Sequence, residues 1–523
     1  MAKSSNRHTA PKNIIIAATL LAAAILPYAG SWKGDFLWDD NTILVDSELV
    51  ADPSGWWKIW VDPPPSHPDY FPLTTLSFWL EWRIWGDSPT GYRVMNTILH
   101  AASVLMLWRL LVAMSIPGAW IAALFFALHP VNAESVAWIS ERKNLLAMLF
   151  AIPSFAWFLR WDSSRKASHY MTSLLLFFLA AAAKASVVTL PLVFAAWGVW
   201  RHGIRSLKST ALPLVPYFLV SLGFGLAVFH FQHTRAIANW DIAMPSVLGR
   251  CGQAGLAFWF YLSKAILPID LATIYPAFPV NPASASVLCL TGLTVAAISI
   301  IWFLWTPLRG LAFGLTAYFL LLLPTLGLLK MSFLKYAPVS DHFQHLALPA
   351  ILACLVAAGY EILAKLPTWR RQIMALTTLI LIVPLAIATT RRANLHASHE
   401  ALWRDAMLKN PSSPQPHTVL ATILKKSDRS REAFFHFQRA ALLAPQDPLV
   451  LSNLGIYYLE NSEPKSAIPF LNQAVSTGQK YPQAYINLSK AFLLLGKLEE
   501  ALTVLKDGAD KFLHDFVAAW TKV

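Results

Sequence analysis

The sequence predicts an all-α protein in which a polytopic transmembrane helix bundle is followed by an α-helical repeat array. Only 14% of the 523 residues are charged and 56% are hydrophobic, whereas a soluble chain carries about 25% charged residues. Residues 1–390 contain 43 charged residues, about 11%, and residues 391–523 contain 28, about 21%. The second part also repeats itself at a fixed offset. We therefore expect a membrane domain over 1–390 and a soluble domain over 391–523.

The apolar segments of the membrane domain predict about 11 to 13 spans, since a spanning helix needs roughly 20 mostly apolar residues. The first segment, 13–30, follows Lys3, Arg7 and Lys12, and this predicts a cytoplasmic N-terminus. A cleaved signal peptide is the alternative interpretation. The other segments are 92–112, 117–129, 143–160, 170–183, 185–200, 211–230, 251–267, 284–305, 310–329, 344–364 and 372–390.

One of these segments, 251–267, contains Gln253, Ser263 and Lys264, so it is either tilted, re-entrant or not a span. Its status decides on which side of the membrane the soluble domain lies. Whether or not this segment spans the membrane, four Lys and Arg residues of the later loops lie on one side and four on the other. The positive-inside rule therefore leaves the side open.

The first loop, residues 31–90, concentrates the acidic residues of the membrane domain. It holds ten acidic and three basic residues, while the rest of the first 390 residues holds seven acidic ones. It also contains eight tryptophans, and tryptophan prefers the headgroup layer of a bilayer. We expect this loop to form helices on the outer membrane surface.

The C-terminal part repeats every 34 residues. A period of this length, with small residues where two helices cross and a proline between units, is typical of tetratricopeptide (TPR) repeats. We expect repeats at about 414–447, 448–481 and 482–515, forming a groove for an acceptor polypeptide or a partner protein. The positions that carry the period are Pro414, Pro448 and Pro482, then Leu420, Leu454 and Leu488, then Ala433, Ala467 and Ala501.

Composition also excludes several classes of protein. The net charge of +13 would favour nucleic-acid binding in a soluble chain, but here the basic residues gather at the ends of apolar segments, where they contact lipid headgroups. We therefore expect a lipid bilayer and no nucleic acid as a partner. Three cysteines, each in an apolar run, exclude a disulfide scaffold.

Two adjacent carboxylates, Asp39 and Asp40, lie just beyond the first span. Crowding and partial burial raise the pKa of one carboxyl while its partner stays ionised, and this suits a general base. The alternative is a solvated acidic turn. Motifs of metalloproteases, P-loop enzymes and dinucleotide-binding enzymes are absent from the sequence.

A polar connector, residues 129–143, joins two predicted spans on the same outer side. Asn132 is a candidate N-cap, and in one continuous helix Glu134, Trp138 and Glu141 would share a face. Such an acidic and aromatic face suits a sugar ring, and the adjacent cations suit a phosphate. An interfacial helix with solvated charges is the alternative. The binding candidates here are His129, Glu134, Trp138, Glu141, Arg142 and Lys143.

Further candidates lie elsewhere in the membrane domain. Lys184 interrupts the apolar region 170–200, and a charge at membrane depth is costly and by default functional, so we expect a lipid phosphate beside it. Lys264 is a weaker candidate for the same role, and contact of its ammonium group with the membrane interface is the favoured alternative. His100 follows Asn96 by one turn in an apolar run, where a histidine is more often a packed core residue. Asp341 and His342 precede an apolar segment and are also binding candidates. The alternative is that they only cap the helix that follows.

Several strings together resemble a known family. These are HPVNAESVAWISERKNLLA at 129–147, WDDN at 38–41, YFPLTTLSFWLEWRIWG at 70–86 and LPTLGL at 323–328, with the TPR repeats at the end. The chain resembles the polytopic GT-C glycosyltransferases related to protein O-mannosyltransferases, specifically the bacterial relatives of the transmembrane-and-TPR type. The resemblance covers nearly the whole chain, and its most specific part is the segment 129–144.

The resemblance implies an inverting membrane enzyme that uses a polyprenyl-phosphate-linked sugar on the exoplasmic side. It implies a hydroxyl acceptor, the TPR domain on that same side and therefore an odd number of spans. The membrane would be the bacterial cytoplasmic membrane. No cofactor is required by the motifs, and a divalent cation is left open.

Carried over by residue, the acidic motif of the family falls on Asp39 and Asp40 as base candidates. Lys184 matches a lysine that a proline usually follows, although Ala185 stands here, and Lys264 with Tyr275-Pro276 matches another segment. The family's ADRYxYLP element is changed: Asp341 is kept, while His342, Phe343 and His345 replace an arginine and two tyrosines. A lost arginine contact to lipid phosphate, or its replacement by His342, would follow.

Two other classes of function compete with the enzyme. A noncatalytic scaffold that recruits partners through its TPR repeats is favoured by the changed element at 341–345. A transporter or lipid flippase is disfavoured, because the sequence shows neither an inverted repeat nor a centrally broken helix pair.

Overall fold

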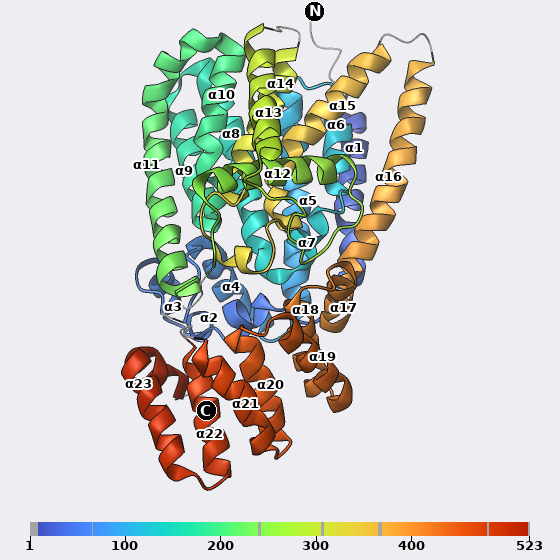
Figure 1. Ribbon diagram of the computed structural model, residues 1–523. Helices are drawn as coiled ribbons and strands as arrows, with labels where there is room; N and C mark the ends of the chain where they lie inside the picture. The colour runs from blue at the N-terminus through green and yellow to red at the C-terminus, as the bar shows by residue number, and fades with distance from the viewer. Residues whose placement is uncertain are drawn as a thin grey trace, which may run out of the picture.

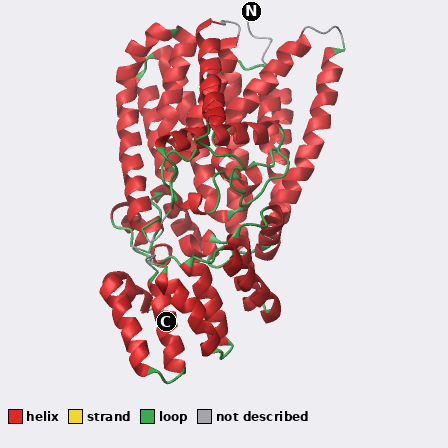
Figure 2. Ribbon diagram, in the orientation of Figure 1, coloured by secondary structure: helices red, strands yellow, loops and turns green. Residues whose placement is uncertain are grey.

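The computed structural model describes residues 9–520 except 65, 239–241, 305–307, 365–368 and 478–480. This described part is built from helices and contains no strand (Figure 2), which confirms the all-α prediction. The N-terminal helices form an upright bundle, and the C-terminal helices pack beneath one end of it (Figure 1).

The bundle consists of helices that follow the apolar segments of the sequence. They are α1 (Thr9–Ile25), α5 (Pro89–Ala113), α6 (Ala119–Ala127), α8 (Arg142–Ser164), α9 (Ala167–Ala183), α10 (Leu190–His202), α11 (Leu207–Phe231), α12 (Val247–Ile266), α13 (Ala285–Leu304), α14 (Arg309–Leu322), α15 (Leu348–Ala364) and α16 (Arg370–Leu395).

Six stretches of the described chain are long and apolar enough to cross a membrane, which makes this a membrane protein. They are Lys12–Ser31, Pro89–Ala113, Ile139–Ser164, Ala211–Ala236, Ala285–Trp302 and Gln372–Leu395. Three more apolar helices are shorter than a span. The expected 11 to 13 spans are therefore not reached by length and composition, because several apolar segments form helices as short as the 9 residues of α6.

The undecided segment 251–267 forms α12, which is not among the six stretches. Figure 1 shows α12 running across the direction of its neighbours, and its Trp259 donates from Nε1 to Thr294 Oγ1 of α13 at 3.1 Å. An amphipathic helix placed in this way explains the polar residues that the sequence carries there.

The first loop forms short helices at the lower end of the bundle: α2 (Glu48–Ala51), α3 (Gly55–Val61) and α4 (Pro72–Trp85). The C-terminal helices lie at the same end (Figure 1). The Asp35 N–H of this loop donates to the Ala397 carbonyl at 3.1 Å, and Lys409 Nζ donates to the Leu271 carbonyl at 2.6 Å. The first loop and the C-terminal domain therefore share one side of the bundle.

The C-terminal helices lie in antiparallel pairs over the region where the period predicts repeats. Proline begins α18, α20 and α22, where its missing N–H is not needed. Ala433, Ala467 and Ala501 are fully buried at the helix crossings. The bounds are α17 (His399–Lys409), α18 (Pro414–Lys426), α19 (Ser430–Leu443), α20 (Pro448–Glu460), α21 (Pro464–Ser476), α22 (Pro482–Leu494) and α23 (Leu498–Trp520).

One of these crossings makes a testable prediction about stability. A Cβ added at Gly455 of α20 would lie 2.5 Å from two side-chain carbons of Leu471, so Gly455→Ala overpacks the contact between α20 and α21. We expect a loss of about 1–3 kcal/mol, seen as a lower thermal unfolding midpoint of the full-length protein in detergent. Gly223→Ala is the control, because a Cβ there meets no atom within 4 Å. A midpoint equal to that of the control would contradict the prediction.

Candidate functional site

The polar connector between α6 and α8 lies at the end of the bundle that faces the C-terminal helices (Figure 1). It forms α7 (Asn132–Ala137) and the 3₁₀ helix η3 (Ile139–Glu141), separated by Trp138 with an extended ψ of 122°. The prediction of one continuous helix is therefore wrong. The break has a physical cause: the Ser140 N–H donates to Asp40 Oδ1 at 2.8 Å, a bond that continuing the helix would not allow.

Asn132 does not cap α7 with its side chain, contrary to the prediction. The residue preceding the helix is Val131, and no side-chain cap bond is present. Asn132 Nδ2 instead donates to the Phe126 carbonyl at 2.7 Å, and its Oδ1 lies 2.9 Å from His345 Nδ1. The amide therefore links the connector to the segment around residue 345.

The structure brings five charged or titratable side chains together from three distant segments, four of them buried and one, Lys143, partly exposed. We call Glu134, Glu141, Lys143, Lys184 and His342 the charged cluster. Glu141 is at its centre, because its carboxylate lies 2.9 Å from Lys143 Nζ, 3.8 Å from Lys184 Nζ and 3.9 Å from His342 Nε2. His342 Nδ1 in turn lies 3.3 Å from Glu134 Oε1.

Two polar side chains that the sequence reasoning missed hold this cluster. Asn144 accepts from Lys184 Nζ at 2.6 Å and donates to Glu141 Oε2 at 2.5 Å. The Ser340 hydroxyl lies 2.9 Å from His342 Nδ1 and 3.5 Å from Glu134 Oε2. Asn144 could have been predicted to contact Glu141, because side chains three residues apart on a helix are neighbours. Nothing in the sequence near Ser340 indicated its contact with the cluster.

The two acids of the first loop have different environments. Asp40 is fully buried and accepts hydrogen bonds from the Leu37 N–H at 2.9 Å, from the Ser140 N–H at 2.8 Å and from the Ser140 hydroxyl. Asp39 is half-buried, and its carboxylate makes no hydrogen bond or ion pair with any described residue. Asp40 thus holds the turn in place, and Asp39 keeps a carboxylate with open acceptor positions.

Asp39 also has a titration behaviour suited to proton transfer. Burial raises the pKa of its carboxyl to about 6, although Lys143 acts to lower it, and the acidic neighbours Asp69, Glu141 and Asp40 raise it further. Because Lys143 belongs to the charged cluster, Asp39 is electrostatically connected to that cluster. Asp69, which the sequence reasoning missed, acts electrostatically on both Asp39 and Lys143.

Arg142 lies outside the charged cluster. Its guanidinium is fully buried, with Nη1 at 2.5 Å from Glu81 Oε1, Nε at 2.7 Å from Asn96 Oδ1 and Nη2 at 2.8 Å from the Tyr92 carbonyl. These partners come from α4 and α5. The expected phosphate contact is therefore not available to Arg142 in this structure, and its contacts join the connector to the first loop.

Three other candidates also lie apart from the charged cluster. His100 is fully buried, with Nε2 at 3.4 Å from the Ala127 carbonyl, and His129 Nε2 lies 3.2 Å from the Ala265 carbonyl. Both contacts are those of packed histidines. Lys264, near the end of α12, donates to the carbonyl of Ile269 five residues later at 2.6 Å.

Asp341 is placed next to the cluster but is held by other partners. Tyr275 OH donates to its Oδ1 at 2.7 Å, and Arg392 Nη2 lies 3.8 Å from its Oδ2. Burial raises the pKa of Asp341 to about 7, and Arg392 opposes this shift. Arg392 therefore supplies, from the end of α16, a guanidinium near the segment that carries His342.

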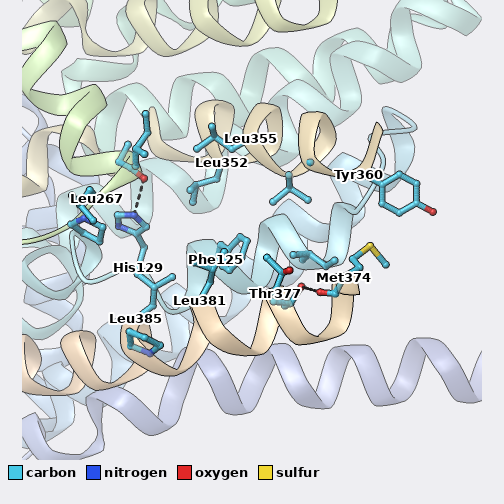
Figure 3. Close-up of a pocket in the computed structure, with 18 of the residues that line it drawn as sticks. Phe125, His129, Leu267, Leu352, Leu355, Tyr360, Met374, Thr377, Leu381 and Leu385 are labelled. Carbon is cyan, nitrogen blue, oxygen red and sulfur yellow. Dashed lines mark hydrogen bonds between the residues drawn. The ribbon is translucent and has the colours of Figure 1, made fainter. Parts of the chain in front are cut away.

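An apolar cavity of about 420 Å³ lies between α15, α16 and α6. Figure 3 shows His129 at one end, bonded to the Ala265 carbonyl, and Tyr360 and Met374 toward the other. Nearly all of its lining is aliphatic or aromatic. A cavity of this kind suits a hydrocarbon chain, with the connector at its polar end.

A divalent cation was left open by the sequence. Among the described residues, no group of three or more His, Cys, Asp or Glu side chains is arranged to hold a metal ion. At the charged cluster the carboxylates of the described residues face lysines and a histidine.

Comparison with known proteins points to one group of relatives. The human protein O-mannosyl-transferase TMTC1 is 25% identical over 94% of this chain and 62% of its own length. Caenorhabditis elegans protein O-mannosyl-transferase F38B6.6 is 31% identical over 29% of this chain and 23% of its own length. No protein-family profile matches the chain.

Among solved structures, yeast Tom70 aligns with 80% of this chain at 12% identity and a TM-score of 0.22, which is too low to support any argument about the fold. The matched part of the chain spans less than two thirds of the length of both curated relatives, 62% of the human protein and 23% of the Caenorhabditis elegans protein. The chain is thus similar, over nearly its whole length, to a larger protein named as a protein O-mannosyl-transferase.

Proposed function

We propose that the protein is a membrane glycosyltransferase that moves a sugar, a hexose such as mannose, from a polyprenyl-phosphate donor to a hydroxyl of a polypeptide. The observation that supports this most is the convergence of the charged cluster and Asp39 at one end of an apolar bundle. The similarity to proteins named O-mannosyl-transferases supports the reaction class. The reaction would occur on the exoplasmic face of a bacterial cytoplasmic membrane, with the N-terminus cytoplasmic and the TPR domain on the exoplasmic side.

In this proposal, Asp39 is the general base. Its free carboxylate takes the proton of a Ser or Thr hydroxyl while the hydroxyl oxygen attacks the anomeric carbon from the face opposite the phosphate. The bond between that carbon and the phosphate oxygen breaks, and the lipid phosphate leaves with the bonding electron pair. A single displacement of this kind inverts the anomeric configuration.

Cations of the charged cluster receive the leaving group. Lys184 is the best placed, because its 3.8 Å separation from Glu141 Oε2 is long for an ion pair and can be exchanged for a contact with phosphate oxygen. Lys143 would add positive charge beside it, and His342 would lie near the same phosphate. Fixed charges of this kind act strongly in a site that excludes water, so no acid catalyst is needed for a phosphate leaving group.

The remaining residues of the connector would hold the sugar. Glu134 and Glu141 can accept hydrogen bonds from sugar hydroxyls, and the Trp138 indole, which stacks on Trp38, would help to shape the sugar site. Asp40 orients the turn that carries Asp39. The apolar cavity between α15 and α16 would hold part of the lipid chain, and the TPR groove would hold the acceptor polypeptide or a partner protein.

The test is direct transfer. Purified full-length protein in lipid nanodiscs is incubated with a panel of radiolabelled polyprenyl-phosphate sugars and Ser/Thr-rich acceptor polypeptides. We expect label in the polypeptide with one donor class only. A wild-type protein that transfers no sugar from the panel while still capturing a polypeptide through its TPR domain would reject the enzyme and support the noncatalytic scaffold, which the changed element at 341–345 favours.

The raised pKa of Asp39 makes a separate prediction about pH. A general base acts only when deprotonated, so the transfer rate should rise as the pH passes through about 6 and level off above it. Lys143 lowers the pKa of Asp39, and Lys143→Gln should therefore move the midpoint of this rise to higher pH. The measurement is the initial rate between pH 4.5 and about 8 at saturating donor. A profile that falls through pH 6 would contradict the assignment of Asp39 as base.

A further inference from the structure

The turn that carries Asp39 has a strained backbone. We call residues 37–40 the Trp38 turn. Trp38 has a φ of +39°, a left-handed conformation that residues other than glycine rarely adopt. Such a conformation persists only where the surrounding structure holds it in place. Because Trp38 directly precedes Asp39, whatever holds Trp38 also sets the position of the Asp39 carboxylate.

The contacts that hold Trp38 come from two sources. On the side of the bundle, its ring stacks on Trp138 with a centroid distance of 5.7 Å and an interplanar angle of 6°, and Tyr336 packs edge-on at 5.3 Å. On the other side lies α17, the first helix of the TPR region. Trp403 of this helix packs edge-on against Trp38 at 5.0 Å and is fully buried.

Helix α17 also contacts the backbone of the turn. His399 Nε2 lies 3.4 Å from the Trp38 N–H and accepts its hydrogen bond. Leu402 packs with Leu37 and Trp138 in one small buried group. Just before α17, Ala397 accepts from the Asp35 N–H at 3.1 Å. The turn is therefore enclosed between the connector and α17.

A chain of ion pairs also links α17 to the segment that carries Asp341 and His342. Asp405 Oδ2 of α17 lies 3.0 Å from Arg392 Nη1, and the Nη2 atom of the same guanidinium lies 3.8 Å from Asp341 Oδ2. Asp341 is adjacent to His342 of the charged cluster. Helix α17 thus contacts the Trp38 turn directly and is linked through Arg392 to the element that carries His342.

From this arrangement we infer that α17 is part of the catalytic centre, and that Trp403 and His399 are positioning residues that hold the Asp39 carboxylate toward the charged cluster. The inference rests on the proposed function for its catalytic consequence. It gives the TPR domain a second role beyond holding an acceptor. A polypeptide that binds there and displaces α17 would also displace the Trp38 turn, which carries Asp39.

The experiment compares variants of the full-length protein in nanodiscs by two measurements. The first is hydrogen–deuterium exchange of the peptide covering residues 35–46, which reports the turn without requiring activity. Trp403→Ala and His399→Ala should increase this exchange, and Trp403→Phe should restore most of the protection. Leu408→Ala is the matched control, because Leu408 lies on the same helix and is 77% exposed.

The second measurement is the rate of sugar transfer. Displacement of a catalytic group by about 1 Å costs about 10²-fold in rate, so Trp403→Ala should lower kcat by about this factor and change the KM for the acceptor much less. The variant should also let water reach the Asp39 carboxyl, which would lower its pKa because burial is what raises it. The midpoint of the rise of transfer rate with pH should therefore lie at a lower pH than in the wild type. The groups that face Asp39, namely Lys143, Asp69, Glu141, Asp40 and Tyr336, are unchanged in this variant.

The outcomes separate the two hypotheses. Unchanged exchange of residues 35–46 in Trp403→Ala and His399→Ala would overturn the positioning role, even if transfer falls. Increased exchange with a lower kcat and a shifted pH midpoint would support it. A wild-type protein that transfers no sugar rejects the proposed function, while the exchange data still decide whether α17 holds the turn.

Discussion

Asp39→Asn should abolish nearly all sugar transfer while leaving the fold intact. The amide is the same size as the carboxylate but cannot take a proton at neutral pH, and loss of a general base typically costs about 10²–10⁴-fold in rate. Since the Asp39 carboxylate makes no hydrogen bond to the described protein, its replacement removes no structural contact. The measurement is kcat for transfer at saturating donor and acceptor, with the thermal unfolding midpoint of each variant as a check on folding.

Two variants control this experiment. Asp87→Asn changes an exposed acid of the same loop and should keep the wild-type rate. Asp40→Asn removes an acceptor that is bonded to Leu37 and Ser140, so it should lower the unfolding midpoint as well as the rate. If Asp39→Asn keeps its rate and a fully folded Asp40→Asn loses it, the base is Asp40 and the assignment made above is wrong.

Glu81→Ala should cause the largest loss of stability. This change leaves the fully buried guanidinium of Arg142 without its 2.5 Å carboxylate partner, and breaking a buried ion pair from one side costs about 3–5 kcal/mol. The pair joins α4 of the first loop to the start of α8, so its loss should loosen the loop that carries Asp39. Thermal and denaturant unfolding of the full-length protein in one detergent would measure the change.

The matched control is Asp52→Ala in the same loop. Asp52 pairs with Lys58 at 2.7 Å, but the two side chains are 32% and 38% exposed, and pairs of this kind contribute about 0–1 kcal/mol. The double variant Glu81→Ala/Arg142→Met should lose less stability than the sum of the single changes, because it removes the unpaired charge. Equal losses for Glu81→Ala and Asp52→Ala would contradict the structural role assigned to Arg142.

Part of the candidate site was predictable because the chemistry of a residue is visible in its type and local context. Asp39, Asp40 and the acids of the connector stood out as charges beside apolar segments, and Lys184 stood out as a charge between two of them. The sequence also placed the acids of the connector beside the cations Arg142 and Lys143. It did not distinguish the two aspartates, because their difference depends on which carboxylate Ser140, 100 residues away, reaches.

Other expectations failed for reasons of packing. Periodicity over 129–143 predicted one helix, since it reads only local spacing, whereas stacking of Trp38 on Trp138 and bonding of Ser140 to Asp40 broke that helix. Arg142 looked like a phosphate ligand because it follows Glu141 directly. Adjacent residues point to different sides of a helix, so Arg142 faces Glu81 while Glu141 faces Lys184.

The sequence by itself determined the membrane class, the helical content, the 34-residue period and the types of chemical group, because hydrophobicity, spacing and ionisable atoms are properties of local stretches of chain. Only the tertiary structure decided which aspartate is free, which cation stays with the charged cluster and that α17 encloses the Trp38 turn. These features depend on contacts between segments up to 361 residues apart. Desolvation and pairing in such contacts, and not residue type alone, set the chemical role of a buried charge.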